Sequence, residues 1–284
     1  MDKRTSWLGN PVAQVACDIV RAVKVIFAVA RNTWKEAVRD RLLYGILFFG
    51  VAMLFFGLVL GEMSMHEERR VVVDVGLAGI SLFSVVIAVV AGVNLLYKEM
   101  ERKTLFTVLS KPISRWQFVV GKFVGLAVTI LIVVALMAVL LVLILIGRGM
   151  GVPDPLPVLL VLIGIEAVVV TAIAVFFSSF ATPFMSGVFT FGLFLIGRNA
   201  DVLADVAVKK AGSVAGGLFE WIVNLAPNLY LFYPSGQMFE DRFVSVHGAP
   251  VSFEYVAWSA TYGLAYASCL VVFAVAIFRR RDVV

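Results

Sequence analysis

Glu166 is the one ionisable residue deep inside a long apolar run of this sequence. A charged carboxylate at the centre of a bilayer costs about 2.5–3.5 kcal/mol on insertion scales, so its side chain must face other helices, a cavity or a partner. We consider a ligand contact at an interface, a structural hydrogen-bond node, and a protonated acid satisfied within the core. We place the node and the protonated acid ahead of the direct contact.

Other reactive side chains are sparse and poorly grouped. His66 and His247 have no companions at ligand spacing, so no metal site is predicted. Cys17 and Cys269 lie far apart in the sequence and indicate no disulfide framework. The phosphate-binding motif G-x-x-x-x-G-K-[ST] is absent, as is a nucleophile motif. We therefore expect no enzyme activity, and no ATP hydrolysis, from this chain alone.

The composition is that of a membrane protein. Of the 284 residues, 61% are hydrophobic and 15% charged, and the mean hydropathy is +0.99. Several apolar runs reach the roughly 17–25 residues that cross a bilayer as helix, and lipid does not satisfy the open backbone of other structures. We predict an all-α integral membrane protein with six spans, at 42–61, 72–97, 117–147, 156–179, 183–198 and 255–278. The third is long enough to tilt, and the fifth is short.

The distribution of Lys and Arg predicts the orientation. Of the 24 basic residues, eight precede residue 42, six lie in 98–122 and three are Arg279, Arg280 and Arg281. Cytoplasmic loops carry the excess of basic residues, so we expect both termini and the 98–122 loop in the cytoplasm. The basic balance then reflects topology and anionic lipid, and nucleic acid is not an expected partner.

Residues 1–41 are predicted to form a cytoplasmic segment with an amphipathic helix in the membrane interface. On a helical wheel, apolar residues including Val23 and Trp34 share one face, while basic residues share another. The residues expected to mark this helix are Arg21, Lys24, Arg31, Trp34 and Lys35. The alternative is that the stretch extends the first span as one long tilted helix. Residues 42–284 would form the six-helix transmembrane domain.

A polar island, residues 98–122, separates two long apolar runs. Pro112 should end a short helix there, and Ser110 or Ser114 could cap the next one. Lys122 should extend its charged head to the headgroups. Exposed apolar side chains ringed by charge suit docking of another protein, although a loop packed under the bundle is an equal alternative.

The residues of this island resemble a family signature. Glu99, Thr104 and Leu105, then Leu-Ser-Lys-Pro-Ile-Ser-Arg over 109–115, followed by Phe118 and Gly121-Lys122, look like the type-2 permease family of ATP-binding cassette transporters. Asn228, within LAPNLYLF, is similar to the subgroup containing gliding-motility and copper-maturation permeases.

The resemblance implies a role for each part. The island would carry a coupling helix seated in a groove of a separate ATPase subunit, which would bind the ATP and Mg²⁺, and the N-terminal helix would brace that subunit. This chain would bind no cofactor. Two permeases, as a homodimer or with a sister chain, would join two ATPases in a bacterial inner membrane and export a substrate between them. The implied coupling positions are Glu99, Thr104, Leu105, Leu109, Ser110, Lys111, Pro112, Ser114 and Arg115.

Residues 199–254 form the one sizeable extracytoplasmic segment. Their mixed composition predicts one or two interfacial helices, then a loop through Pro227, Pro234 and Gly236. An alternative function uses this segment: a membrane scaffold or mechanotransmitter, through which ATPase cycles act on extracytoplasmic partners without moving a solute. A membrane-embedded enzyme would need a polar cluster in the spans, where Glu166 stands alone.

Overall fold

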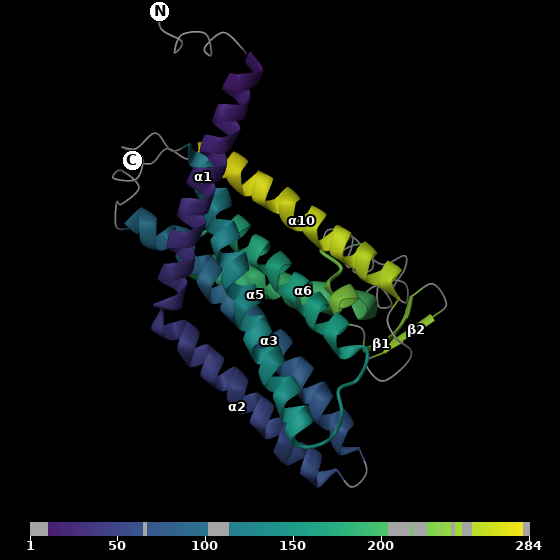
Figure 1. Cartoon of the computed structure of the whole chain (residues 1–284). Coiled ribbons are helices and arrows are strands. Elements are labelled where there is room, and N and C mark those ends of the chain that lie inside the picture. The colour runs from purple at the N-terminus through teal and green to yellow at the C-terminus, as the bar shows by residue number, and fades with distance from the viewer. Residues whose placement is uncertain are drawn as a thin grey trace, which may run out of the picture.

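The computed structural model describes residues 11–64, 67–101, 114–203, 217, 226–233, 235–239, 242–245 and 252–280. It is predominantly helical (Figure 1). The long elements are α1 (Pro11–Val38), α2 (Arg41–Met63), α3 (Glu68–Glu101), α5 (Arg115–Gly147), α6 (Leu156–Ser178), α7 (Pro183–Arg198) and α10 (Phe253–Arg280). A short 3-10 helix, η2 (Leu229–Phe232), and strands β1 (Ser235–Phe239) and β2 (Arg242–Ser245) precede α10.

Among the described residues, five helices are long and apolar enough to cross a membrane, namely α2, α3, α5, α6 and α10. Their bounds lie close to five of the predicted spans. The helix α7 occupies the fifth predicted span, but its 16 residues extend only about 24 Å, short of a bilayer core of roughly 30 Å. The structure therefore supports five spanning helices, and a sixth complete span stays a prediction.

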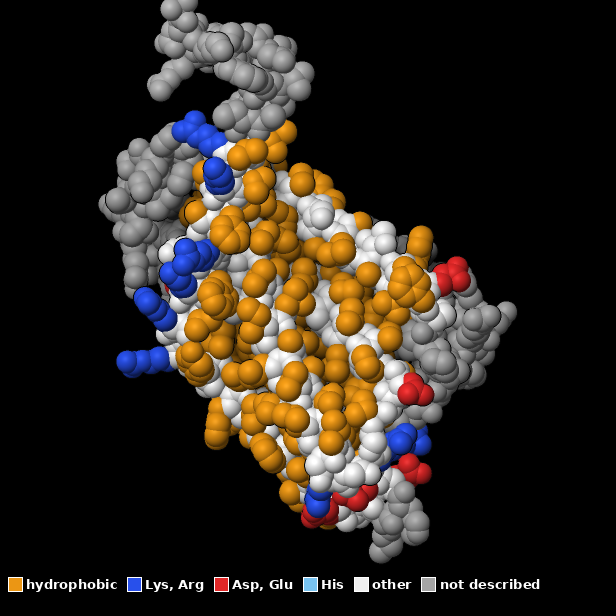
Figure 2. All heavy atoms as spheres, viewed as in Figure 1, with side chains coloured by type: hydrophobic (Ala, Val, Ile, Leu, Met, Phe, Trp, Pro, Cys, Tyr) orange, Lys and Arg blue, Asp and Glu red, His pale blue; other side chains and the backbone are white. Residues whose placement is uncertain are grey.

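The helix α6 forms the centre of the bundle. It contacts α3, α5, α7 and α10, and most of its length is buried. Large apolar side chains are exposed on the outer helices instead, among them Phe48 on α2, Leu143 on α5 and Phe184 on α7. Figure 2 shows this apolar surface covering the middle of the molecule. Such an exterior is expected where lipid, and not water, surrounds the helices.

A sharp corner separates α1 from α2. The helix α1 ends at Val38, and Asp40 is the N-cap of α2, where its side chain accepts a hydrogen bond from the Leu42 backbone N–H at 3.0 Å. An aspartate cap satisfies a backbone donor that the first turn of a helix leaves free. The alternative of one continuous tilted helix through the first span is therefore wrong.

The turn between α5 and α6 is built by glycine. Gly149 and Gly151 have φ of 67° and 70°, a left-handed conformation that a residue with a Cβ adopts at a cost. Arg148, the C-cap of α5, forms an ion pair with Glu62 near the end of α2. The hydrogen bond to Glu62, together with the negative charge of the Glu62 carboxylate, raises the pKa of Arg148.

The segment before α10 differs from the predicted loop. β1 and β2 form an antiparallel hairpin, so Gly236 lies in a strand. Four residues of η2 precede this hairpin, and Leu229 and Phe232 are buried. Alternating side chains did not stand out in so short a stretch, which is why the sequence suggested only a loop. Most of the predicted interfacial helices lies outside the described residues.

Candidate functional site

Three parts of the chain meet at one end of the bundle, which we call the basic end. There α1 crosses the start of α5, and the end of α10 lies beside α5 (Figure 1). The rings of Phe118 on α5 and Phe278 on α10 stack with centroids 6.5 Å apart. Arg115 donates a hydrogen bond to the Arg279 carbonyl at 3.5 Å, near the end of α10. The two helix ends are thus joined by both apolar and polar contacts.

Three of the implied coupling positions lie within the described residues. Glu99 lies in the last turn of α3, Ser114 is the N-cap of α5, and Arg115 is its first residue. Ser114 thus occupies one of the two predicted cap positions, and its backbone N–H donates to Gln117 Oε1 at 3.2 Å. The remaining coupling positions, Thr104, Leu105, Leu109, Ser110, Lys111 and Pro112, lie outside the described residues.

Two glycines one turn apart let α1 approach the backbone of α5. A Cβ on Gly121 would lie 2.8 Å from Val29 Cβ, and one on Gly125 would lie 2.6 Å from the Ala30 carbonyl oxygen. Both distances are shorter than real Cβ contacts allow. Small residues four apart create such close helix crossings in membrane proteins. The two glycines therefore fix where α1 crosses α5.

Lys122 lies between these glycines and is covered by α1. Its side chain is only 2% exposed, and its Nζ lies 3.7 Å from Glu36 Oε2 and 5.5 Å from the centroid of the Phe118 ring. The prediction that Lys122 extends to the headgroups is wrong, because the neighbouring helix supplies a carboxylate and covers the lysine. The spacing of residues within one helix does not reveal that a side chain will be buried by a neighbouring helix.

The helix α1 has three sides. Ala30 and Thr33 are buried against α5, while the predicted basic residues of α1 are exposed. A third side carries exposed apolar residues, including Phe27 and Trp34. On a wheel of about 100° per residue the two exposed sides adjoin. The predicted marker residues Arg21, Lys24, Arg31 and Lys35 occupy the basic side.

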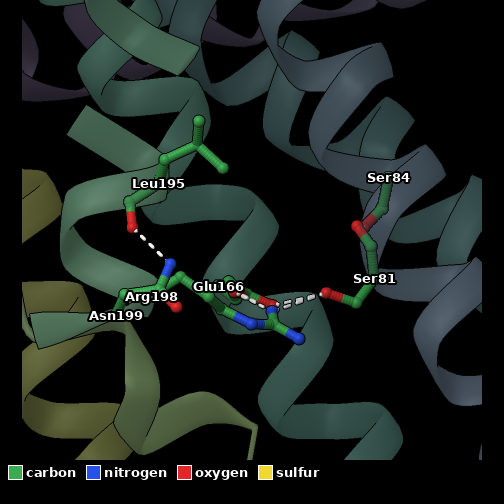
Figure 3. Close-up of polar contacts among 6 residues, drawn as sticks. All are labelled: Ser81, Ser84, Glu166, Leu195, Arg198 and Asn199. Carbon is green, nitrogen blue, oxygen red and sulfur yellow. Dashed lines mark hydrogen bonds and ion pairs between the residues drawn. The ribbon is translucent and has the colours of Figure 1, made fainter. Parts of the chain in front are cut away.

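Glu166 forms a buried ion pair (Figure 3). Its side chain is completely buried, and Arg198 Nη1 lies 2.6 Å from Glu166 Oε1. Ser81 on α3 donates to Glu166 Oε2 at 2.9 Å, and Arg198 also donates to Ser81 Oγ at 2.8 Å. Three helices, α3, α6 and α7, thus share one charge-neutral network. The hydrogen-bond node proposed for Glu166 fits this geometry.

Arg198 is the functional residue that the sequence interpretation missed. It is the last residue of α7, and its guanidinium lies over the Tyr233 ring, 4.1 Å from the centroid. Arginine on an aromatic face is a stabilising cation–π arrangement. The available signal was its position at the end of the shortest apolar segment. A short segment places its terminal Arg198 within the membrane, at the depth of Glu166.

The short length of α7 leaves a space that residues 226–233 fill. Glu166 lies ten residues, or about 15 Å, from the start of α6, and Arg198 ends α7 at that depth. A Cβ on Gly263, ten residues into α10, would lie 2.8 Å from Phe232. Leu229 packs beside Gly197 of α7. The segment is therefore inserted between α6, α7 and α10, well below the ends of α6 and α10.

Tyrosines of α10 satisfy the backbone of this inserted segment. The Tyr255 hydroxyl donates to the Leu231 carbonyl at 2.6 Å, and the Asn228 N–H donates to the Tyr262 hydroxyl at 3.0 Å. Irregular backbone at membrane depth is tolerated where protein surrounds and satisfies it. Asn228, which carried the resemblance to a subgroup, is thus tied to α10 through its backbone.

Comparison with known proteins supports the resemblance. The family described as ABC-2 family transporter protein matches residues 27–283, which is nearly the whole chain. The match does not distinguish the gliding-motility and copper-maturation subgroup, and no curated protein matches the sequence. The match includes the second part of α1, from residue 27, and every later helix described above. The chain therefore belongs to the ABC-2 family of transporter proteins, the multi-pass membrane permease components of ATP-binding cassette transporters.

Proposed function

We propose that this chain couples ATP hydrolysis by a separate ATPase subunit to export of a substrate, and that the ATPase docks at the basic end. The convergence of α1, α5 and α10 at this end carries the proposal. The 102–113 stretch, with most of the implied coupling positions, connects α3 to α5 there. A displacement of that stretch would move α5. It would pass to α1 through the close contacts at Gly121 and Gly125, and to α10 through the contacts of Phe118 and Arg115.

The charge distribution supports a cytoplasmic basic end. In Figure 2, Lys and Arg side chains line the upper left edge, whereas Asp and Glu gather at the lower right with a few basic ones. Basic residues prefer the cytoplasmic side. Both termini then lie in the cytoplasm, and α1 rests in the interface, with Trp34 on its apolar side and its basic side toward the headgroups. The membrane would be a bacterial inner membrane.

The proposed assembly holds two permeases and two ATPase subunits, with ATP and Mg²⁺ on the ATPases. The exposed apolar faces of the outer helices offer area for a second permease as well as for lipid. The substrate path would lie between the permeases. Because Glu166 is completely buried and paired, we assign it to holding the bundle together and not to contact with the substrate.

The first experiment is mass spectrometry of the proteins that co-purify with the full chain in mild detergent. We expect an ATPase subunit with the native chain and at least a tenfold smaller amount with Leu105→Asp/Leu109→Asp. Docking would bury the two new carboxylates in an apolar contact, which costs free energy and weakens binding. Val152→Asp is the matched control, since Val152 is an exposed apolar residue in the α5–α6 turn. Equal recovery of the ATPase from the double variant would contradict docking at this loop.

Substrate dependence separates this proposal from the scaffold alternative. An exporter should show ATPase activity that rises when its substrate is added to the reconstituted complex. A mechanotransmitter should instead retain an extracytoplasmic partner and show no such stimulation. The inserted 226–233 segment and the β1–β2 hairpin are where that partner would bind.

A further inference from the structure

Polar side chains are exposed on the surface just beyond the end of α7. Asn199 and Asp201 follow Arg198 there, and both residues are exposed. Arg198 lies at the depth of Glu166, about 15 Å from the start of α6. Because three further residues extend a chain by at most about 11 Å, Asp201 still lies below the start of α6. This carboxylate is therefore exposed at a depth where the outer helices present apolar side chains.

Lipid does not satisfy these polar groups. The Asn199 amide donates a hydrogen bond to the Leu195 carbonyl at 2.8 Å, one turn back along α7 (Figure 3). No ion pair joins Asp201 to another described residue. Charged residues at membrane depth face a bundle interior or a water-filled cavity, because hydrocarbon offers neither hydrogen bonds nor a counter-charge. We therefore expect the surface around Asp201 to meet water and not acyl chains.

The neighbouring η2 contributes two tyrosines to the same surface. Tyr233 follows Tyr230 by three residues, and its N–H donates to the Tyr230 carbonyl, so the two side chains lie on one side of the 3-10 turn. Both are partly exposed, while the other three residues of η2 are buried. Asp201 lies close enough to Tyr230 to act electrostatically on its hydroxyl. Asp201, Tyr230 and Tyr233 together form what we call the acidic face.

The acidic face suits a positively charged group. The Tyr233 ring already holds a cation, since the Arg198 guanidinium lies 4.1 Å from its centroid. Arg198 adds no net charge there, because Glu166 forms an ion pair with it at 2.6 Å. The carboxylate of Asp201 therefore sets the sign of the charge on this face. A carboxylate beside the faces of aromatic rings is a combination that attracts an ammonium or a guanidinium.

We propose that the acidic face lines the water-filled extracytoplasmic part of the substrate path, and that it favours substrates with a positively charged group. The inference rests on the function proposed above, to which it adds a location in the path and a class of substrate. Two permeases facing one path would present two such carboxylates to it. Charges of one sign in a cleft raise the local concentration of ions of the opposite sign, so an anionic substrate would be disfavoured at the same place.

Charged thiol reagents test both parts of the proposal. In the full chain with Cys17 and Cys269 replaced by alanine, Val202→Cys places a thiol next to Asp201, at a residue that is 57% exposed. Intact cells are treated with a methanethiosulfonate reagent that carries either a trimethylammonium or a sulfonate group. Each rate is divided by the rate of the same reagent with 2-mercaptoethanol. We expect the cationic reagent to react at least about fivefold faster by this measure, since the negative charge concentrates it.

Two further variants complete the test. Asp201→Asn retains the size of the side chain and should reduce the preference for the cationic reagent at least about threefold. Val139→Cys on α5 is the matched control, because Val139 is 58% exposed but lies among apolar residues, about 12 Å from the end of α5. Its thiol faces lipid and should react with neither reagent.

Each contrary result overturns the proposal. A Val202→Cys chain as unreactive as the Val139→Cys chain would show that lipid covers the acidic face. Equal normalised rates of the two reagents, or a preference unchanged by Asp201→Asn, would show that the face selects no cation. These rates do not depend on recovery of the ATPase. An ATPase that co-purifies while Val202→Cys stays unreactive would leave the proposed function intact and refute this inference alone.

Discussion

At the scale of single residues, the buried pair of Glu166 and Arg198 shows how a charge is accommodated at membrane depth. Neither side chain could lie there alone without a large desolvation cost. Ser81 uses its hydroxyl as donor to the carboxylate and as acceptor from the guanidinium, so both ions gain a second hydrogen bond. Tyr233 covers the guanidinium with its ring. The network also connects the inserted segment to the transmembrane helices.

Removing one member of this pair should be worse than removing both. We expect Glu166→Leu to destabilise the folded chain by about 3–5 kcal/mol, because it leaves Arg198, which is only 22% exposed, without its counter-charge. Glu166→Leu combined with Arg198→Met should recover much of that loss. Thermal unfolding of the native chain, Glu166→Leu, Arg198→Met and the double variant in one detergent measures the coupling. A loss in the double variant equal to the sum of the two single losses would show that the pair contributes nothing jointly.

At the scale of elements, the α1–α5 crossing is the contact on which coupling would depend. Backbone contact at Gly121 and Gly125 holds α1 along α5, and the Lys122–Glu36 pair lies between them. Glu36 is 49% exposed, so solvent weakens this pair and close packing is the stronger restraint. A helix held by packing transmits displacement, because packed interfaces shift as units and deform little.

Adding one methyl group at the crossing should test this restraint. Gly125→Ala places a Cβ against Thr33 and the Ala30 carbonyl, so α1 must shift, at a cost of about 1–3 kcal/mol. We expect a lower unfolding temperature and less co-purified ATPase. Gly147→Ala, at the other end of α5, meets open space and should leave both unchanged. If the two variants behave alike, the crossing does not restrain α1.

At the scale of the whole molecule, the two ends of the bundle differ in charge and in construction. The basic end joins the ends of α5 and α10 through apolar contacts, and the proposed coupling residues Ser114 and Arg115 begin α5 there. The opposite end carries the glycine turn between α5 and α6. The helix α7 is shorter than the spanning helices, and residues 226–233 occupy the space beside its end within the bundle. The asymmetry predicts which end faces the cytoplasm.

Cysteine labelling should establish this orientation. In a background with Cys17 and Cys269 replaced by alanine, Asp154→Cys lies in the exposed α5–α6 turn and Arg39→Cys at the exposed α1–α2 corner. A membrane-impermeant maleimide should label Asp154→Cys in intact cells, and Arg39→Cys only after permeabilisation. The reverse pattern would invert the topology and place the 98–122 loop outside the cytoplasm.

The sequence by itself determined the helices, their approximate bounds and the family, because long apolar runs report the surrounding solvent and the signature is contiguous. The tertiary structure decided which side chains contact one another. Arg198 meets Glu166 only because α7 ends at mid-depth, and Lys122 is covered only because two glycines admit α1. The corner that ends α1, and the insertion of residues 226–233, also depend on contacts between distant segments. Hydropathy records how deep a residue lies, whereas its partner is set by packing between helices far apart in the sequence.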